Sequence, residues 1–422
     1  MFLDRTTLAV YAPKMTSKPE VRFLDRTTPP HIITLVLIAG LGAMNMSAFL
    51  PSLPAMTEHF QTDYGIMQLA VSLYLAMTAV LQLFIGPISD RYGRRSVLLW
   101  SFVVFIITTI GCLLAPTIEV FLFFRMAQAV VAAGLVLSRA IVRDMVPQEE
   151  AASMIGYVTM GMALVPMVAP MIGGALDQAF GWQATFIFLT LAGIAVFALT
   201  WFDLGETASG EGKTFAAQFA DYPELFRARR FWGYVMTSAF ASGAFFAFLG
   251  GAPFVASDVY GLDAFWAGVG FGAPAIGYAM GNYLSGRYSV RFGINAMIRW
   301  GTFVSLGGLT IASVLSASGL SGPILFFGFC TFVGLGNGMV IPNASAGMLS
   351  VRPHLAGTAS GVGSSIMIGG GAALSVFAGS VLTAGGTSLP LLLIMTVSTG
   401  LAVLSILYVE AREKAVARQE TL

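Results

Sequence analysis

Two long apolar runs of this chain are separated by one short polar stretch, Gly86-Pro87-Ile88-Ser89-Asp90-Arg91-Tyr92-Gly93-Arg94-Arg95. The ten residues hold three arginines, one aspartate and two glycines, whereas segments 66–85 and 96–115 on either side contain no charged residue. A charged side chain at the centre of a bilayer costs about 2.5–3.5 kcal/mol on insertion scales. The pattern therefore predicts a tight loop at the water-facing surface that joins two membrane-spanning helices.

The composition of the whole chain is that of an integral membrane protein. Of its 422 residues, 56% are hydrophobic and 10% are charged, and the mean hydropathy is +0.80. Soluble domains carry about 25% charged residues. The apolar segments are continuous over about 20 residues and do not alternate, which favours helices over a β-barrel. We predict an all-α membrane protein embedded in a lipid bilayer, and the net charge of +1 argues against a nucleic-acid partner.

The apolar segments predict twelve transmembrane helices in two six-helix halves. In the first half the predicted spans are 32–53, 66–88, 96–115, 120–141, 153–176 and 184–202. In the second half they are 233–255, 265–286, 297–317, 323–346, 356–384 and 389–409. The predicted domains are an N-terminal tail (1–31), an N-terminal half (32–202), a cytoplasmic linker (203–232), a C-terminal half (233–409) and a C-terminal tail (410–422).

Basic residues predict the orientation, because cytoplasmic loops carry an excess of lysine and arginine. With both termini in the cytoplasm, every lysine and arginine except Arg125 falls in a cytoplasmic loop, tail or helix end. The outer loops then carry acidic residues and no basic residue: Glu58, Asp63, Asp177, Asp258 and Asp263.

The polar stretch recurs 200 residues later, at 286–293. Five positions correspond: Gly86 with Gly286, Ser89 with Ser289, Arg91 with Arg291, Tyr92 with Phe292, and Gly93 with Gly293. The recurrence indicates two halves of the same orientation, each with this stretch between its second and third spans. Parallel repeats with a substrate site at their midplane interface are a transporter architecture.

Several segments resemble one known family. The pattern Gly86-x3-Asp90-Arg91-Tyr92-Gly93-Arg94-Arg95 resembles the loop 2–3 signature of the major facilitator superfamily. Segments 50–56, 125–128, 139–144 and 251–255 resemble its bicyclomycin/chloramphenicol-resistance branch of drug:proton antiporters. In span five, the pattern Pro166-x3-Pro170-x2-Gly173-Gly174 resembles the antiporter motif. The resemblance implies the twelve-helix major facilitator fold and drug export in exchange for protons.

The resemblance also implies that Asp90 caps a neighbouring helix and pairs with arginine, which latches the inward side shut. Such a carboxylate gains charge-assisted hydrogen bonds. The alternative is a group of solvated positive-inside charges. The candidates for coupling and gating are Asp90, Arg91, Arg94, Arg95, Arg125, Arg139 and Asp144.

Arg125 lies within the fourth predicted span, where a guanidinium must face a cavity or a partner. Gln128 lies one turn further on, and Arg139 lies only about 40° round an ideal helix from Arg125. We predict a role in substrate or proton coupling. The alternative is an arginine that extends to the outer headgroups.

Other polar and aromatic residues in the spans are candidates for substrate binding. Each polar one has the alternative of a helix–helix hydrogen bond worth about 0.6 kcal/mol, and the phenylalanines that of facing lipid. The candidates are Asn45, Ser47, Tyr74, Gln128, Phe245, Phe248 and Asn337. Pro166, Pro170, Gly173 and Gly174 are expected to kink span five and to let a neighbouring span approach closely.

No pattern in the sequence indicates an enzyme, a cofactor or a metal site. We predict a monomeric inner-membrane secondary transporter that exports small apolar or amphipathic compounds by proton antiport. No predicted span has a carboxylate near its middle, and Ser47 stands where the resembled branch commonly has aspartate. The proton sites are then peripheral (Asp90, Asp144, Glu119 or Asp258), or the substrate carries the proton. The alternatives are transport of a metabolite without antiport, and a transporter-derived membrane sensor.

Overall fold

The computed structural model describes residues 21–145, 168–207, 222–352, 355–382 and 386–420, together with Met154, Val158 and Val165. Within these residues the chain is helical and contains no strand. The first half comprises α1 (Ile32–Ser47), α2 (Leu53–His59), α3 (Tyr64–Met67), α4 (Leu69–Tyr92), α5 (Arg94–Leu113), α6 (Ile118–Ala127), α7 (Ala132–Met145) and α9 (Gln183–Asp203). The second half comprises α11 (Tyr222–Phe226), α12 (Arg229–Phe254), α13 (Ala264–Phe271), α14 (Ala273–Phe292), α15 (Ile294–Ala317), α16 (Pro323–Val351), α17 (Ala356–Val381) and α18 (Leu389–Glu420).

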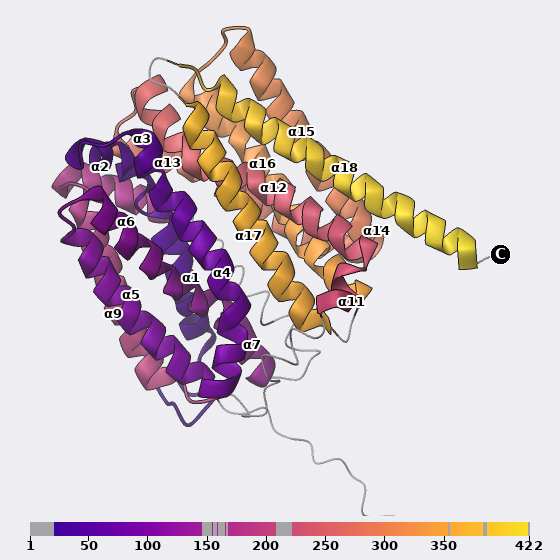
Figure 1. Ribbon diagram of the computed structural model, residues 1–422, viewed down its shortest axis with the longest axis horizontal. Coiled ribbons are helices and arrows are strands. Elements are labelled where there is room, and N and C mark those ends of the chain that lie inside the picture. The colour runs from indigo at the N-terminus through magenta and orange to yellow at the C-terminus, as the bar shows by residue number, and fades with distance from the viewer. Residues whose placement is uncertain are drawn as a thin grey trace, which may run out of the picture.

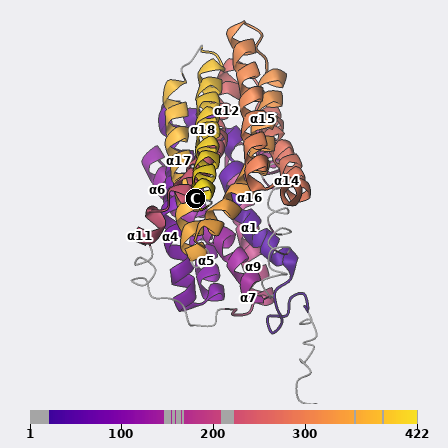
Figure 2. The ribbon, with the colours of Figure 1, turned by 90° about the vertical axis from the view of Figure 1, so that its right-hand side faces the viewer.

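The two halves form two helical bundles that lie side by side (Figure 1). The axes of the long helices are roughly aligned with one another (Figure 2). Helix α4 of the first half packs along α17 of the second, so these two helices form much of the interface between the halves. The predicted all-helical, two-half fold is confirmed.

Ten helical segments of the described chain are long and apolar enough to cross a membrane. The eighth predicted span, 265–286, corresponds to α13 and α14, which are separated at Gly272. Much of the fifth predicted span, 153–176, lies outside the described residues, and its last part belongs to a helix over residues 168–180. The described chain is consistent with twelve spans.

The prediction of a ten-residue loop at 86–95 was wrong. Helix α4 continues to Tyr92 and α5 begins at Arg94, so Gly93 alone makes the turn, with φ of +90°. A helix need not end where the apolar segment ends, because its charged side chains reach water while its backbone stays hydrogen-bonded. The turn requires glycine, since positive φ is strained for residues with a Cβ.

Gly293 makes the same turn between α14 and α15, with φ of +84°. The N–H groups of Gly93 and Gly293 donate to the carbonyl oxygens of Ser89 and Ser289, each over 2.9 Å. The repeat seen in the sequence is therefore also a repeat of backbone geometry. We call the end of the bundle that carries these two turns the basic end. The acidic end is the other one, which carries Glu58, Asp63, Asp258 and Asp263.

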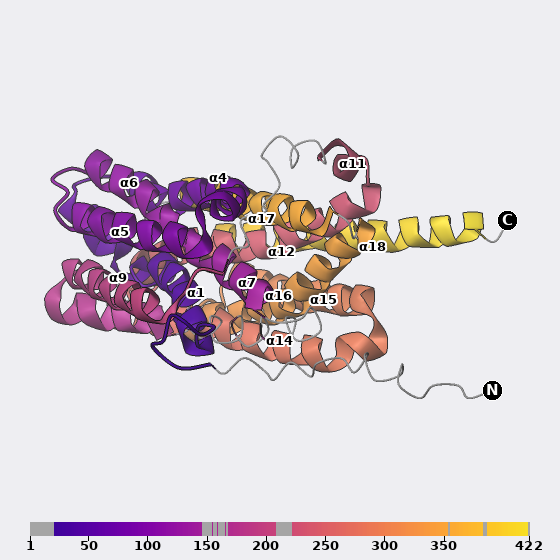
Figure 3. The same ribbon diagram turned by 90° about the horizontal axis from the view of Figure 1, so that it is seen from below.

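The last helix is longer than the predicted final span, 389–409. Helix α18 continues to Glu420 and extends beyond the rest of the bundle (Figure 3). Two ion pairs tie this extension to the second half: Glu410 with Arg299 at 2.9 Å, and Glu413 with Arg230 at 2.5 Å. Residues 410–420 of the segment predicted as a C-terminal tail thus continue the last helix.

Candidate functional site

A cavity of about 450 Å³ lies between the two halves and opens at the basic end. Its volume lies within the range of small-molecule sites. Helices α4 and α7 form one wall, with Gln82, Asp90 and Arg139, and α17 forms the other, with Ser364 and Ile368. The cavity is thus lined by a mixture of polar, charged and apolar groups, as recognition of an amphipathic compound requires.

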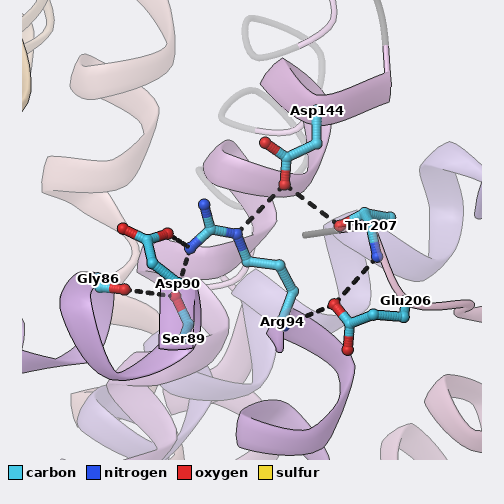
Figure 4. Close-up of polar contacts among 7 residues, drawn as sticks. All are labelled: Gly86, Ser89, Asp90, Arg94, Asp144, Glu206 and Thr207. Atoms are coloured by element: carbon cyan, nitrogen blue, oxygen red, sulfur yellow. Dashed lines mark hydrogen bonds and ion pairs between the residues drawn. The ribbon is translucent and has the colours of Figure 1, made fainter. Parts of the chain in front are cut away.

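Arg94 is the centre of a polar cluster at the mouth of this cavity (Figure 4). Its Nη1 lies 2.5 Å from Asp90 Oδ1 and also donates to Ser89 Oγ, and its Nε lies 3.2 Å from Asp144 Oδ2. Its backbone N–H donates to Glu206 Oε1 over 2.8 Å. Three of these partners belong to the first half, and Glu206 follows directly after it. These contacts join α4, α5, α7 and the segment after α9, and none of the contacts described for Arg94 reaches the second half.

The other arginines of the predicted gating set have different surroundings. Arg95 donates to Leu204 O (2.8 Å) and Trp201 O (3.1 Å), and its guanidinium lies 4.9 Å from the centre of the Trp201 ring. It therefore holds the C-terminal end of α9, where free carbonyls favour a cation. Arg91 is exposed and lies over the ring of Tyr92, and Arg139 lines the cavity.

Arg94→Ala is expected to lower the free energy of unfolding by about 1–3 kcal/mol, because its charge-assisted hydrogen bonds are lost from a largely buried site. Arg91→Ala removes the same charge from an exposed position and should change it by less than about 0.5 kcal/mol. Thermal unfolding of the purified protein compares the two. Equal effects of the two substitutions would contradict the assigned role of the cluster.

Arg125, at the end of α6, is fully enclosed, with 1% of its surface exposed. Its Nε donates to Ala70 O (3.1 Å), Nη1 to Asn45 Oδ1 (2.9 Å) and Gln128 Oε1 (2.6 Å), and Nη2 to Asn45 O (3.0 Å). Gln128 in turn donates to Thr109 Oγ1 over 2.8 Å. This burial excludes the alternative in which Arg125 extends to the outer headgroups.

Two aromatic rings lie over the Arg125 guanidinium, with the centres of Phe49 and Tyr74 at 4.2 and 4.4 Å from Cζ. Such contacts contribute about 2 kcal/mol or more when the cation is desolvated. Among the described residues, no carboxylate forms an ion pair with Arg125. Neutral acceptors and aromatic faces therefore stabilise this cation.

The remaining predicted substrate residues do not line the cavity between the halves. Ser47 is buried at the end of α1 and donates to Ala43 O over 3.0 Å. Phe248 packs among the aromatic rings of the second half, with Phe245 stacked against it. Asn337 is buried within α16.

The acidic end is closed by hydrogen bonds between the halves. Gln68 Nε2 donates to Ser375 O (2.7 Å) and to Ser375 Oγ (2.8 Å). The hydroxyl of Tyr64 donates to Gly250 O (3.1 Å) and accepts from the N–H of Phe254 (3.2 Å). Tyr64 thus contacts the donor and the acceptor of one turn of α12, next to Pro253, from the other half.

Tyr64→Phe is expected to weaken this closure by about 1 kcal/mol, since Gly250 O and the Phe254 N–H can then bond to each other. The fraction of molecules open at the acidic end should rise about fivefold. A Ser375→Cys variant, which keeps the bond from Gln68 to the backbone carbonyl of residue 375, is labelled with a membrane-impermeant maleimide with and without Tyr64→Phe, and the ratio of the two rates measures this change. Tyr92→Phe, at an exposed tyrosine, is the control and should leave the labelling rate unchanged.

Small residues allow the halves to touch at the same end. An added Cβ would lie 2.1 Å from Ala264 O at Gly174, and 2.4 Å from Pro170 O at Gly268. At Gly173 it would lie 1.7 Å from Ala48 O, within the first half. Pro166, the remaining member of the predicted packing motif, lies outside the described residues.

Three residues of these contacts were not predicted from the sequence: Gln68, Tyr64 and Glu206. Glutamine and tyrosine near a span end are common, and no spacing singles them out. Glu206 follows α9 in sequence, and only the tertiary structure brings it onto Gly93, where an added Cβ would lie 2.2 Å from its Oε2.

The family model of the Major Facilitator Superfamily matches residues 35–376. The chain belongs to the Major Facilitator Superfamily. It is 30% identical over 333 residues to the uncharacterized MFS-type transporter YdgK of Bacillus subtilis (strain 168), covering 77% of this chain and 82% of YdgK. It is 30% identical over 328 residues to a chloramphenicol resistance protein of Pseudomonas aeruginosa, covering 77% of each chain.

A bicyclomycin resistance protein homolog of Haemophilus influenzae (strain ATCC 51907 / DSM 11121 / KW20 / Rd) is 26% identical over 395 residues, covering 92% of this chain and 98% of the relative. The predicted resemblance to this branch of the superfamily is confirmed. Among solved structures, a D-xylose–proton symporter superposes with a TM-score of 0.71 at 14% identity, covering 90% of this chain and 96% of the symporter. At that identity the superposition bears on the fold alone.

Proposed function

We propose that this superfamily member exports small apolar or amphipathic compounds, antibiotics among them, across the bacterial inner membrane in exchange for protons. The observation that carries the proposal is the cavity, which is open at the basic end while hydrogen bonds between the halves close the acidic end. The positive-inside rule assigns the basic end to the cytoplasm. The conformation is then inward-facing and ready to take up a compound from the cell interior.

The relatives support the same direction of transport, because chloramphenicol and bicyclomycin resistance proteins are named among them. The mixed lining of the cavity suits compounds with apolar bodies and a few polar groups. Alternating access then requires the two halves to rock about this cavity. Rocking would separate the Gln68–Ser375 contact and bring the Arg94 cluster towards α17.

Asp90 and Asp144 are the proposed proton sites, since both line the cavity and both contact Arg94. Protonation of either carboxylate weakens its pairing with the guanidinium and so changes the relative energies of the two facing states. Glu119 and Asp258, the other carboxylates considered from the sequence, do not line the cavity.

Transport by everted membrane vesicles tests the proposal. Chloramphenicol, bicyclomycin and a sulfonamide are added to vesicles with an acidified interior, and a pH-sensitive dye records proton release. Asp90→Asn and Asp144→Asn should abolish or strongly reduce release that Arg291→Ala, a charge change at the exposed Gly293 turn, leaves intact. No flux of any of the compounds would reject export, and flux without proton release would reject antiport.

Facilitated transport without antiport is the second candidate. The observation that favours it is the Arg125 site, where neutral groups stand beside a buried cation and no described carboxylate pairs with it. In the vesicle experiment this candidate predicts flux that is independent of the pH gradient.

A further inference from the structure

The Arg125 guanidinium lies in the protein interior, and among the described residues no opposite charge contacts it. Burial of an unpaired ion is strongly unfavourable, and proteins normally pair it or neutralise it. The four protein hydrogen bonds use four of the five guanidinium N–H groups, which leaves one hydrogen on Nη2. The site therefore has one positive charge without a counter-charge and one N–H group of Arg125 without an acceptor.

Further donors surround this cation without a partner. Asn45 Nδ2 and Thr78 Oγ1 are both buried and have no hydrogen-bond partner among the described residues. The Tyr74 hydroxyl faces both of these side chains, and its one oxygen can accept at most two hydrogens, fewer than the donors around it supply. Buried donors normally have acceptors, so an N–H of Asn45, the Thr78 hydroxyl and the remaining N–H of Arg125 together call for an acceptor that the described chain does not supply.

The charge and the donors select the chemistry of the ligand. A cation with unpartnered donors attracts an anion, and the rings of Phe49 and Tyr74 over the guanidinium leave its edge as the direction of approach. A small monovalent anion matches the single positive charge.

The cavity between the halves provides the route. Gln82 lines the cavity from α4. Thr78 lies one helical turn from Gln82 towards the acidic end, and Tyr74 lies one turn beyond Thr78. One face of α4 therefore carries polar side chains from the inner end of the cavity, at Gln82, to the buried surroundings of Arg125.

We propose that Arg125, Asn45 and Thr78 form a binding site for a small monovalent anion, either a free halide or the carboxylate group of a transported compound. The anion supplies the negative charge that the chain itself does not place beside Arg125. Its binding stabilises the first half, since α1, α4 and α6 all contribute groups to the site.

Thermal unfolding of the purified protein tests the site. Cys112 and Cys330 are fully buried, so a fluorogenic maleimide reports their exposure on unfolding. At constant ionic strength, sodium chloride or sodium acetate should raise the unfolding temperature by about 3 °C or more over sodium gluconate. Stabilisation by chloride alone identifies a halide site, and stabilisation by acetate as well identifies carboxylate recognition. Equal unfolding temperatures in all three salts would overturn the proposal.

The second part of the experiment uses a substitution that places a negative charge of the protein itself beside Arg125. Asn45→Asp places a carboxylate where Oδ1 already lies 2.9 Å from Arg125 Nη1, and should remove the dependence on the anion. Gln128→Glu does the same from Oε1, at 2.6 Å, if the first variant does not fold. Asn337→Asp, a matched charge buried in α16, should keep the wild-type anion effect. Retention of the full effect in the Asn45→Asp and Gln128→Glu variants would exclude Arg125 as the site.

Discussion

Arg125→Lys should destabilise the protein by about 2–5 kcal/mol, although it preserves the charge. The guanidinium reaches acceptors on three segments at once: Ala70 O, both oxygens of Asn45, and Gln128 Oε1. A lysine ammonium is a compact charge with three donors and lacks this planar geometry. Each buried acceptor left without a donor costs about 1–3 kcal/mol. Thermal unfolding followed through Cys112 and Cys330 measures the loss.

Arg291→Lys is the matched control, because Arg291 lies exposed at the Gly293 turn and contacts only the ring of Phe292 among the interactions described. We expect its unfolding temperature to equal that of the wild type. If Arg125→Lys were as stable as this control, the hydrogen bonds at Arg125 would not hold α1, α4 and α6 together.

Gly174→Ala should shift the protein towards a conformation open at the acidic end. The new Cβ would lie 2.1 Å from Ala264 O, a backbone atom of the other half that can move away only if the halves separate. Overpacking of this kind costs about 1–3 kcal/mol, which is about a 5- to 150-fold change in the ratio of the two conformations. Labelling of Ser375→Cys from the acidic side should accelerate accordingly, and drug export should fall.

Gly307→Ala provides the control for this experiment. Gly307 lies in α15, where an added Cβ meets nothing within 4 Å, so the substitution only raises helix propensity. Its labelling and transport should match those of the wild type. Unchanged labelling of Gly174→Ala would show that the contact between Gly174 and Ala264 does not hold the acidic end closed.

The fold was accessible from the sequence because it depends on local properties. Apolar segments of about 20 residues must be helices in a bilayer, since each backbone group has to be hydrogen-bonded within its own segment. The recurrence of the Gly86–Gly93 pattern at Gly286–Gly293 indicated two parallel halves. This repeat is visible in the sequence because a tight turn with positive φ requires glycine at that position, whatever surrounds it. The extent of the loop was misjudged, since a helix can continue past the apolar segment into water.

The site depended on contacts between distant segments. Arg125 stood out in the sequence by its charge, but its surroundings come from three separate helices. Phe245 and Phe248 were predicted to bind substrate because they are aromatic residues within a span. In the structure they pack among other aromatic rings of the second half. Only the tertiary structure distinguishes these cases, because an apolar side chain has the same local pattern whether it lines a cavity or fills a core.

The sequence by itself determined the membrane location, the helical class, the duplicated halves and the family resemblance, all of which follow from hydropathy, charge and short motifs. The tertiary structure decided which end is open and which side chains face the cavity. It also placed Arg125 among neutral groups rather than at headgroups or beside a described carboxylate. The physical reason is that the closing contacts, such as Gln68 with Ser375, join residues 307 positions apart. Their hydrogen bonds exist only when the two bundles meet.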